Sequence, residues 1–155
     1  MATYTLVHVV LSLVGIATGL LVLLGLLAGK RYNASTAVFL ATTVATSLTG
    51  YGFPFEHLLP SHIVGAVSLV VLALAIYARY ARHLAGGWRT VYVIGAITAL
   101  YLNVFVLVVQ SFLKVPVLHD LAPTQSEPPF AVAQLAVLVL FIVLGTLAVR
   151  RSKTI

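Results

Sequence analysis

The sequence predicts an all-α bundle of five membrane-spanning helices, and three observations lead to this fold class. The first is composition: 61% of the 155 residues are hydrophobic and 8% are charged, whereas about a quarter of the residues in a soluble domain are charged. The second is the length of the apolar segments, because crossing the hydrocarbon core takes roughly 20 residues. The third is the alternation of basic turns. We therefore expect one domain, residues 1–155, embedded in lipid.

Polar and proline-containing turns separate the five predicted spans. We place these spans at about residues 4–29, 35–53, 62–80, 90–113 and 130–149. The first apolar segment is longer than the ~7–15 residues of a signal-peptide core, and no basic residue precedes it. We therefore expect it to remain in the mature protein.

Charge predicts the orientation of the bundle. Alternate turns give one side of the membrane eight of the nine basic residues, namely Lys30, Arg31, Arg79, Arg82, Arg89, Arg150, Arg151 and Lys153. The other side receives Lys114 and all three acids, Glu56, Asp120 and Glu127. The positive-inside rule then places the N-terminus outside and the C-terminus in the cytoplasm. Cations at helix ends meet lipid headgroups, so the net charge of +6 does not predict binding of nucleic acid.

Polar residues within the spans predict close helix packing. Gly15 and Gly19 have the G-x-x-x-G spacing that lets two backbones approach. Asn103 and Gln110 are seven residues apart and share one helix face, and Gln134 adds a third carboxamide. Because a carboxamide in hydrocarbon is costly unless it is paired, these side chains should point into the bundle. Interhelical hydrogen bonding explains them, and the lining of a quinone or substrate pocket is the alternative.

Histidines give the sharpest functional hypothesis. His8 lies about one turn inside the first span, where an ionisable group is a functional candidate by default. His62 follows Ser61, which can cap the third span and place His62 in its first turn. The two imidazoles are therefore expected on separate helices at similar depth on the outer side. His57 and His119 lie on the same side as secondary candidates, and Gln110 is a further candidate for contact with a cofactor.

Three chemistries would use such an arrangement. Haem b takes two axial imidazoles from separate helices. A divalent metal such as zinc or copper would bind His8 and His62 together with a carboxylate from Glu56, Asp120 or Glu127. A proton site would use an imidazole with carboxylates as relay partners. Against all three, histidines at helix ends also occur simply as interfacial polar groups.

The functional alternatives follow from these chemistries. The first is a histidine-lined outer site that binds haem or metal for electron transfer or metal handling. The second is a non-catalytic accessory subunit without a cofactor, and the third is a transporter of protons or a small solute. No catalytic motif is present, which favours a protein that is not an enzyme. Expected partners are the lipid bilayer, a quinone or another membrane subunit, and a homo-oligomer is a further expectation.

The longest turn, KVPVLHDLAPTQSEPPF (114–130), is moderately apolar. Leu118, Leu121 and Phe130 indicate that it folds onto the bundle, and its prolines stiffen it against disorder. A lid over a pocket and a plain interfacial cap are the two interpretations of this segment.

Two segments carry a resemblance. TSLTGYGFPFEHLLPSHIVG (46–65) and LYLNVFVLVVQSFLKVPVLHDLAPTQSEPPFAVAQL (100–135) resemble a family of small uncharacterised bacterial inner-membrane proteins. The resemblance implies a multi-pass fold in the bacterial inner membrane and transfers no site residue. Small membrane cytochromes of the b561 type are similar in architecture only, since none of their sequence signatures is found here.

Overall fold

The structure is a computed structural model that describes residues 2–54 and 60–155. In these residues the chain is all-helical. The elements are α1 (Ala2–Leu27), α2 (Asn33–Gly50), α3 (Pro60–Ile76), the π-helical turn η1 (Tyr77–Ala81), α4 (Trp88–Lys114), α5 (Pro116–Leu121) and α6 (Pro128–Arg151). Five of these helices correspond to the predicted spans, with boundaries within a few residues of those expected. The remaining helix, α5, lies in the turn that was expected to be irregular.

Of the five predicted membrane spans, four meet the criterion of length and composition. Within the described residues, four helices are long and apolar enough to cross a membrane, and these are α1, α3 with η1, α4 and α6. Helix α2 has 18 residues, rich in threonine, and it is not among them. The hydroxyl groups of its threonines and serines lower the hydropathy of this helix. The protein is therefore a multi-pass membrane protein by its helices, and its apolar surface fits a lipid bilayer.

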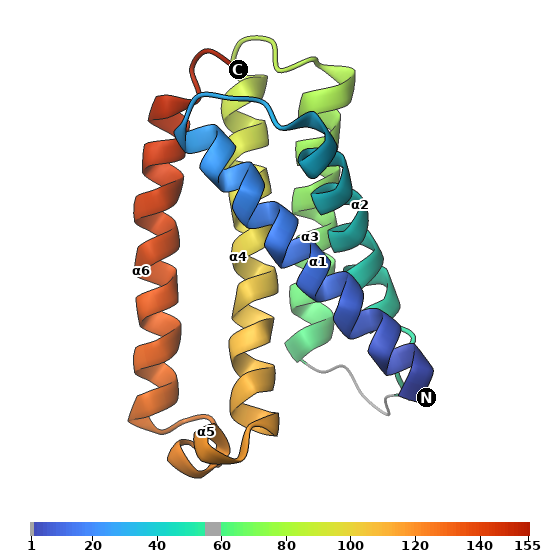
Figure 1. Cartoon of the computed structure of the whole chain (residues 1–155), viewed down its shortest axis with the longest axis vertical. Helices are drawn as coiled ribbons and strands as arrows, with labels where there is room; N and C mark the ends of the chain where they lie inside the picture. Colours follow the sequence, from blue (N-terminus) through green and yellow to red (C-terminus); the bar gives the residue numbers. More distant parts are fainter. Residues whose placement is uncertain (1, 55–59) are drawn as a thin grey trace.

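The helices run alternately up and down the bundle, and this separates the turns into two ends (Figure 1). The turns 28–32 and 82–87 and the C-terminus lie together at one end, which we call the basic end. The N-terminus and α5 lie at the other end, which we call the N-terminal end. Eight basic residues therefore gather at one end, as the alternation in the sequence predicts.

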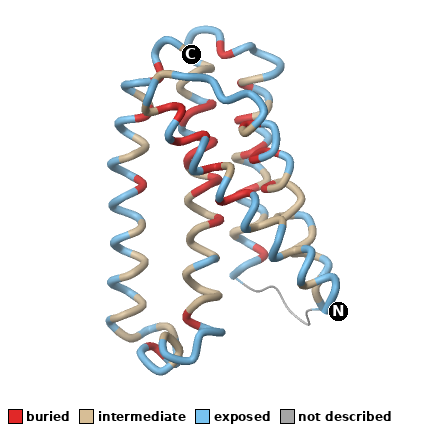
Figure 2. Tube along the Cα trace, in the orientation of Figure 1, coloured by how far each residue is buried: buried red, intermediate tan, exposed pale blue. Residues whose placement is uncertain are grey.

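Helix α4 is the centre of the bundle, because it packs against α1, α2, α3, α5 and α6. Helix α1 packs chiefly against α2, whereas α6 contacts only α4 and α1 to a substantial extent among the described elements. The buried residues concentrate in the half near the basic end (Figure 2). There Leu23, Phe39, Leu72, Tyr92 and Leu100 form the apolar core.

Side chains at the basic end tie several elements together. The Arg79 guanidinium on η1 donates to Asn33 Oδ1 on α2 at 2.6 Å, and it lies 5.2 Å from the centre of the Tyr92 ring on α4. Arg89 on α4 donates to the backbone carbonyl of Ser152 at 3.0 Å, just beyond α6. These contacts give the basic residues a structural role besides any contact with lipid headgroups.

The turn 114–130 folds onto the bundle, as its apolar residues predict. Phe130 packs edge-on against Phe112 with ring centres 5.4 Å apart, and Gln125 donates to the carbonyl of Val109 at 2.9 Å. Pro116 starts α5 at a position that needs no backbone N–H. Leu121 is half-exposed, so this part of the expected contact with the bundle is not made.

Candidate functional site

A small cavity of about 110 Å³ lies between α1, α2, α3 and α4, in the half of the bundle near the N-terminal end. Many of its lining residues have short polar side chains although most of its wall is apolar, and His8 is the ionisable residue that it contains. The polar lining residues are His8, Ser12, Thr43, Thr46, Ser47, Ser61, Ser68 and Asn103. The apolar core ends where this cavity begins, so the two halves of the bundle differ in character.

His8 is held by a hydrogen bond to α2. Its Nδ1 lies 2.7 Å from the Thr49 hydroxyl oxygen. The Thr49 hydroxyl also lies 2.7 Å from the carbonyl of Ala45. When the hydroxyl donates to this carbonyl, its oxygen accepts from His8, so that Nδ1 carries the proton and Nε2 is the acceptor nitrogen of the neutral ring.

Aromatic residues pack around the His8 ring. Phe53 lies edge-on to His8 with ring centres 5.1 Å apart, and Tyr4 lies edge-on to Phe53 at 5.0 Å. The Tyr4 hydroxyl donates to the carbonyl of Thr49 at 2.6 Å. Gly52 is required for this packing, because a Cβ atom at that position would collide with the Tyr4 hydroxyl. The imidazole is therefore fixed by neighbours on two sides.

One buried hydroxyl in the cavity lining is left unsatisfied by the protein. The Thr43 side chain is 2% exposed, and its Oγ1 has no hydrogen-bond partner among the described residues. By contrast, the Thr46 hydroxyl donates to the carbonyl of Thr42, and Ser12 donates to Asn103 Oδ1 at 2.9 Å. A buried polar atom without a partner is costly, so Thr43 is a strained element of the cavity wall in the described part of the chain. A volume of about 110 Å³ admits only something of the size of a few water molecules.

His62 lies in the first turn of α3, as predicted, and it is 7% exposed. Its ring packs against the Tyr51 ring with centres 5.4 Å apart, and the Tyr51 hydroxyl donates to the His62 carbonyl. Its helix neighbours Ser61 and Gly65 line the cavity, whereas His62 is not part of the lining. The helix starts at Pro60, so Ser61 lies within it and the expected Ser61 cap is wrong.

The other candidates do not converge on His8. Asp120 is exposed on α5, and the Glu127 carboxylate accepts hydrogen bonds from Thr124 in its own turn. Nδ1 of His119 is buried in α5 without a partner in the described part of the chain. Gln110 is half-buried on α4, outside the cavity lining. Glu56 and His57 lie outside the described residues.

The predicted metal and haem sites are not found. Residues 2–54 and 60–155 contain no group of three or more His, Cys, Asp or Glu side chains placed to hold a metal ion. The cavity beside His8 is also well below the ~300–1,000 Å³ typical of pockets for larger organic ligands, so haem does not fit there. Among the described residues, the polar groups that line this cavity with His8 are hydroxyls and a carboxamide, and neither Asp120 nor Glu127 is part of the lining.

The hydroxyl groups are the part of the site that sequence reasoning missed. The polar contacts predicted within the spans involve carboxamides, and Thr43, Thr46, Ser47 and Ser68 are not among them. A signal for them was available, since serine and threonine recur at helical spacing in α2 and α3. Comparison of the chain with protein-family models, curated proteins and solved structures finds no match, so the resemblance to bacterial inner-membrane proteins identifies no family and the site rests on its geometry.

Proposed function

We propose that this chain is a multi-pass membrane protein that transfers protons, with His8 as the proton-binding residue. One observation carries the proposal: His8 lines a cavity with hydroxyl-bearing side chains, and its Nδ1 is hydrogen-bonded to the Thr49 hydroxyl. We assign the proton of the neutral ring to Nδ1, which makes Nε2 the basic nitrogen. Histidine is suited to this role because its charge changes near physiological pH. The hydroxyls of the cavity can both donate and accept, so they can pass a proton to or from a bound water molecule.

The two other functions expected from the sequence receive less support. Electron transfer through haem or metal lacks a matching set of ligands among the described residues. An accessory subunit would explain the packing of the helices, but it would give no role to an ionisable residue at the wall of a cavity. Transfer of a small polar solute together with the proton is compatible with the same cavity.

Nuclear magnetic resonance of the protein with 15N-labelled histidine in lipid nanodiscs tests the proton site. We expect the neutral form of His8 to carry its proton on Nδ1 and to take up the second proton on Nε2. Thr49→Val removes the acceptor and should shift the neutral ring toward the other tautomer. Thr42→Val is the matched control, because the Thr42 hydroxyl bonds within α2 to Val38 and Thr42 does not line the cavity. A neutral His8 with its proton on Nε2 in the wild type would contradict the assignment.

Proton transfer itself is measured in liposomes that contain a pH-sensitive dye. His8→Gln should abolish the proton flux that a membrane potential drives through the wild-type protein. His83→Gln is the matched control, because His83 is exposed at the basic end. Absence of flux in the wild type, or equal flux in the His8→Gln variant, would overturn the proposal.

We also propose that α2 crosses the membrane, so that the chain crosses it five times. Helices α1 and α3 run in the same direction along the bundle (Figure 1), so a chain that crosses the membrane through both must return between them. Helix α2 has 18 residues, a length of about 27 Å at 1.5 Å per residue, and its hydroxyls at Thr42, Thr46 and Thr49 bond to carbonyls of its own helix. This bonding lowers the cost of placing them in lipid. The basic end then faces the cytoplasm, in a bacterial inner membrane.

A further inference from the structure

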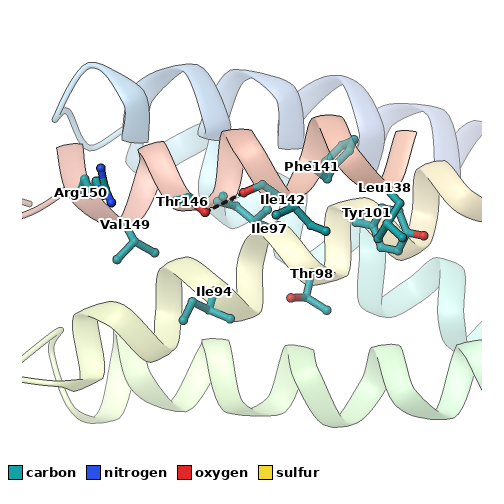
Figure 3. A pocket seen from close by; sticks show the side chains of 11 residues that line it. Ile94, Ile97, Thr98, Tyr101, Leu138, Phe141, Ile142, Thr146, Val149 and Arg150 are labelled. Carbon is teal, nitrogen blue, oxygen red and sulfur yellow. Dashed lines mark hydrogen bonds between the residues drawn. The ribbon is translucent and has the colours of Figure 1, made fainter. Parts of the chain in front are cut away.

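A second hollow of the bundle lies on its outer surface, between α4 and α6, and it is larger than the cavity beside His8. Its volume is about 440 Å³, within the range of pockets that bind organic ligands. Figure 3 shows Ile94 and Thr98 of α4 and Ile142 and Thr146 of α6 along it, with Arg150 at one end. The lining is otherwise mostly apolar. We call this hollow the α4–α6 groove.

The groove combines an apolar wall with one positive charge at a defined position. Arg150 lies in the last turn of α6, at the basic end of the bundle. Arg151 follows it on the same helix and is exposed, but it does not line the groove. The charge that faces the groove is therefore at the depth of a lipid headgroup, and the apolar wall extends from it toward the middle of the bundle.

The length of the groove matches one leaflet of a bilayer. Along α6 the lining extends from Leu138 to Arg150, which corresponds to about 18 Å at a rise of 1.5 Å per residue. Half of a hydrocarbon core of about 30 Å is about 15 Å. An acyl chain anchored by its headgroup at Arg150 would therefore fill the groove and end near Tyr101 and Leu138.

We propose that the α4–α6 groove binds an anionic phospholipid of the leaflet at the basic end, with its phosphate at Arg150 and one acyl chain between the two helices. Charge complementarity selects an anionic headgroup, because Arg150 is the basic residue that lines the groove. Gly145 has no side chain, and this leaves room for the acyl chain. A Cβ atom at Gly145 would meet Ile97 at an ordinary contact distance of 3.5 Å, so the two helices are not pressed together at this point of the groove.

Native mass spectrometry with added lipid tests this site on the full chain. Phosphatidylglycerol and phosphatidylcholine with identical acyl chains are titrated onto the delipidated protein in detergent. We expect a saturable site that prefers phosphatidylglycerol, and Arg150→Gln should weaken its binding about fivefold, the effect of one cation near an anionic lipid. Arg151→Gln is the matched control and should leave the affinity unchanged. Equal affinity for the two lipids, or equal effects of the two substitutions, would overturn the proposal.

Blocking the groove separates a lipid in this groove from lipid elsewhere on the surface. Thr146→Phe places a ring in the groove and should abolish the saturable site, whereas Leu147→Phe changes an exposed neighbour outside the lining and should preserve it. Both proteins are checked for an unchanged thermal midpoint. Two results would overturn the proposal. In the first, ubiquinone displaces phosphatidylglycerol and Arg150→Gln does not change the binding of either molecule. In the second, the wild-type protein is a dimer that Thr146→Phe dissociates.

Discussion

Gly19 shows how strongly a single residue controls the approach of the helices. A Cβ atom at this position would lie 2.6 Å from Leu100 Cδ1 and 2.9 Å from the Phe39 ring. Both neighbours belong to the buried core, and Phe39 is 1% exposed. Close approach of α1 to α2 and α4 therefore depends on the absence of a side chain here, as the G-x-x-x-G spacing predicts.

Gly19→Ala should destabilise the folded protein by about 1–3 kcal/mol, because the core has no room for an added methyl group and must shift to accept it. The measurement is the thermal midpoint in detergent. Gly145→Ala serves as the control, because the corresponding Cβ contact there is an ordinary 3.5 Å. Equal midpoints for the two variants would show that α1 can move away from its neighbours at little cost.

At the same scale, the sequence singles out His8 as a candidate but does not predict its hydrogen-bond partner. An ionisable residue within an apolar span is conspicuous by itself, and its proposed role stays a prediction. Its bond to Thr49 joins residues 41 positions apart, and this pairing depends on how α1 crosses α2. Threonine is also ambiguous in a sequence, since its hydroxyl can bond to its own helix, as that of Thr46 does, or line a cavity, as that of Thr43 does.

Among the elements, α2 and α5 are the two that the sequence described least well. The apolar and hydroxyl-rich residues of α2 correctly predicted a helix, but its hydropathy does not mark it as a span. Helix α5 is only six residues long, too short for a periodic pattern of apolar residues to appear. The long helices were predictable because each is a sustained apolar run with polar turns at its ends.

Glu127 organises the start of α6 and gives this element a dependence on pH. Its carboxylate accepts the Thr124 hydroxyl at 2.7 Å and the backbone N–H groups of Thr124 and Ser126 at 3.1 Å. The bond from the Thr124 side chain is the main cause that holds the pKa of Glu127 below its ordinary value. A lowered pKa in the folded state means that the ionised carboxylate stabilises this turn.

The stabilisation by Glu127 is present above the pKa of the unfolded chain and is lost as the pH falls through the lowered pKa of the folded protein. Glu127→Gln should therefore reduce the thermal midpoint at neutral pH, and the difference from the wild type should disappear in acid. The exposed Asp120 provides the control Asp120→Asn, which should show a smaller effect. A wild-type advantage that persists at low pH would contradict the role of the charge.

On the scale of the whole molecule, the bundle has two unlike halves. The half near the basic end is closed by the apolar core and by contacts such as Arg79 with Asn33. The other half contains the cavity and His8. A proton that reaches His8 from the N-terminal end would therefore meet a closed core beyond the cavity. In the proposed function, passage of a proton between His8 and the basic end would require the helices of the closed half to move.

The arrangement of the two ends can be tested because the chain contains no cysteine. Single cysteines at the exposed positions Lys30, Ala85 and Lys153 should react with a membrane-impermeant maleimide only from the cytoplasmic side of oriented vesicles. Cysteines at the exposed Ala2 and Asp120 should react only from the opposite side. Each variant is also labelled after detergent is added, which shows that its cysteine is reactive.

The decisive comparison in this experiment is between positions 30 and 85, which flank the pair α2 and α3. If α2 crosses the membrane together with α3, these two positions react from the same side. If α2 lies on the surface while α3 crosses, position 85 reacts from the side opposite to position 30. The second outcome would mean that α1 and α3 cross the membrane in opposite directions. His8 and Thr43 would then no longer lie in one cavity between four crossing helices.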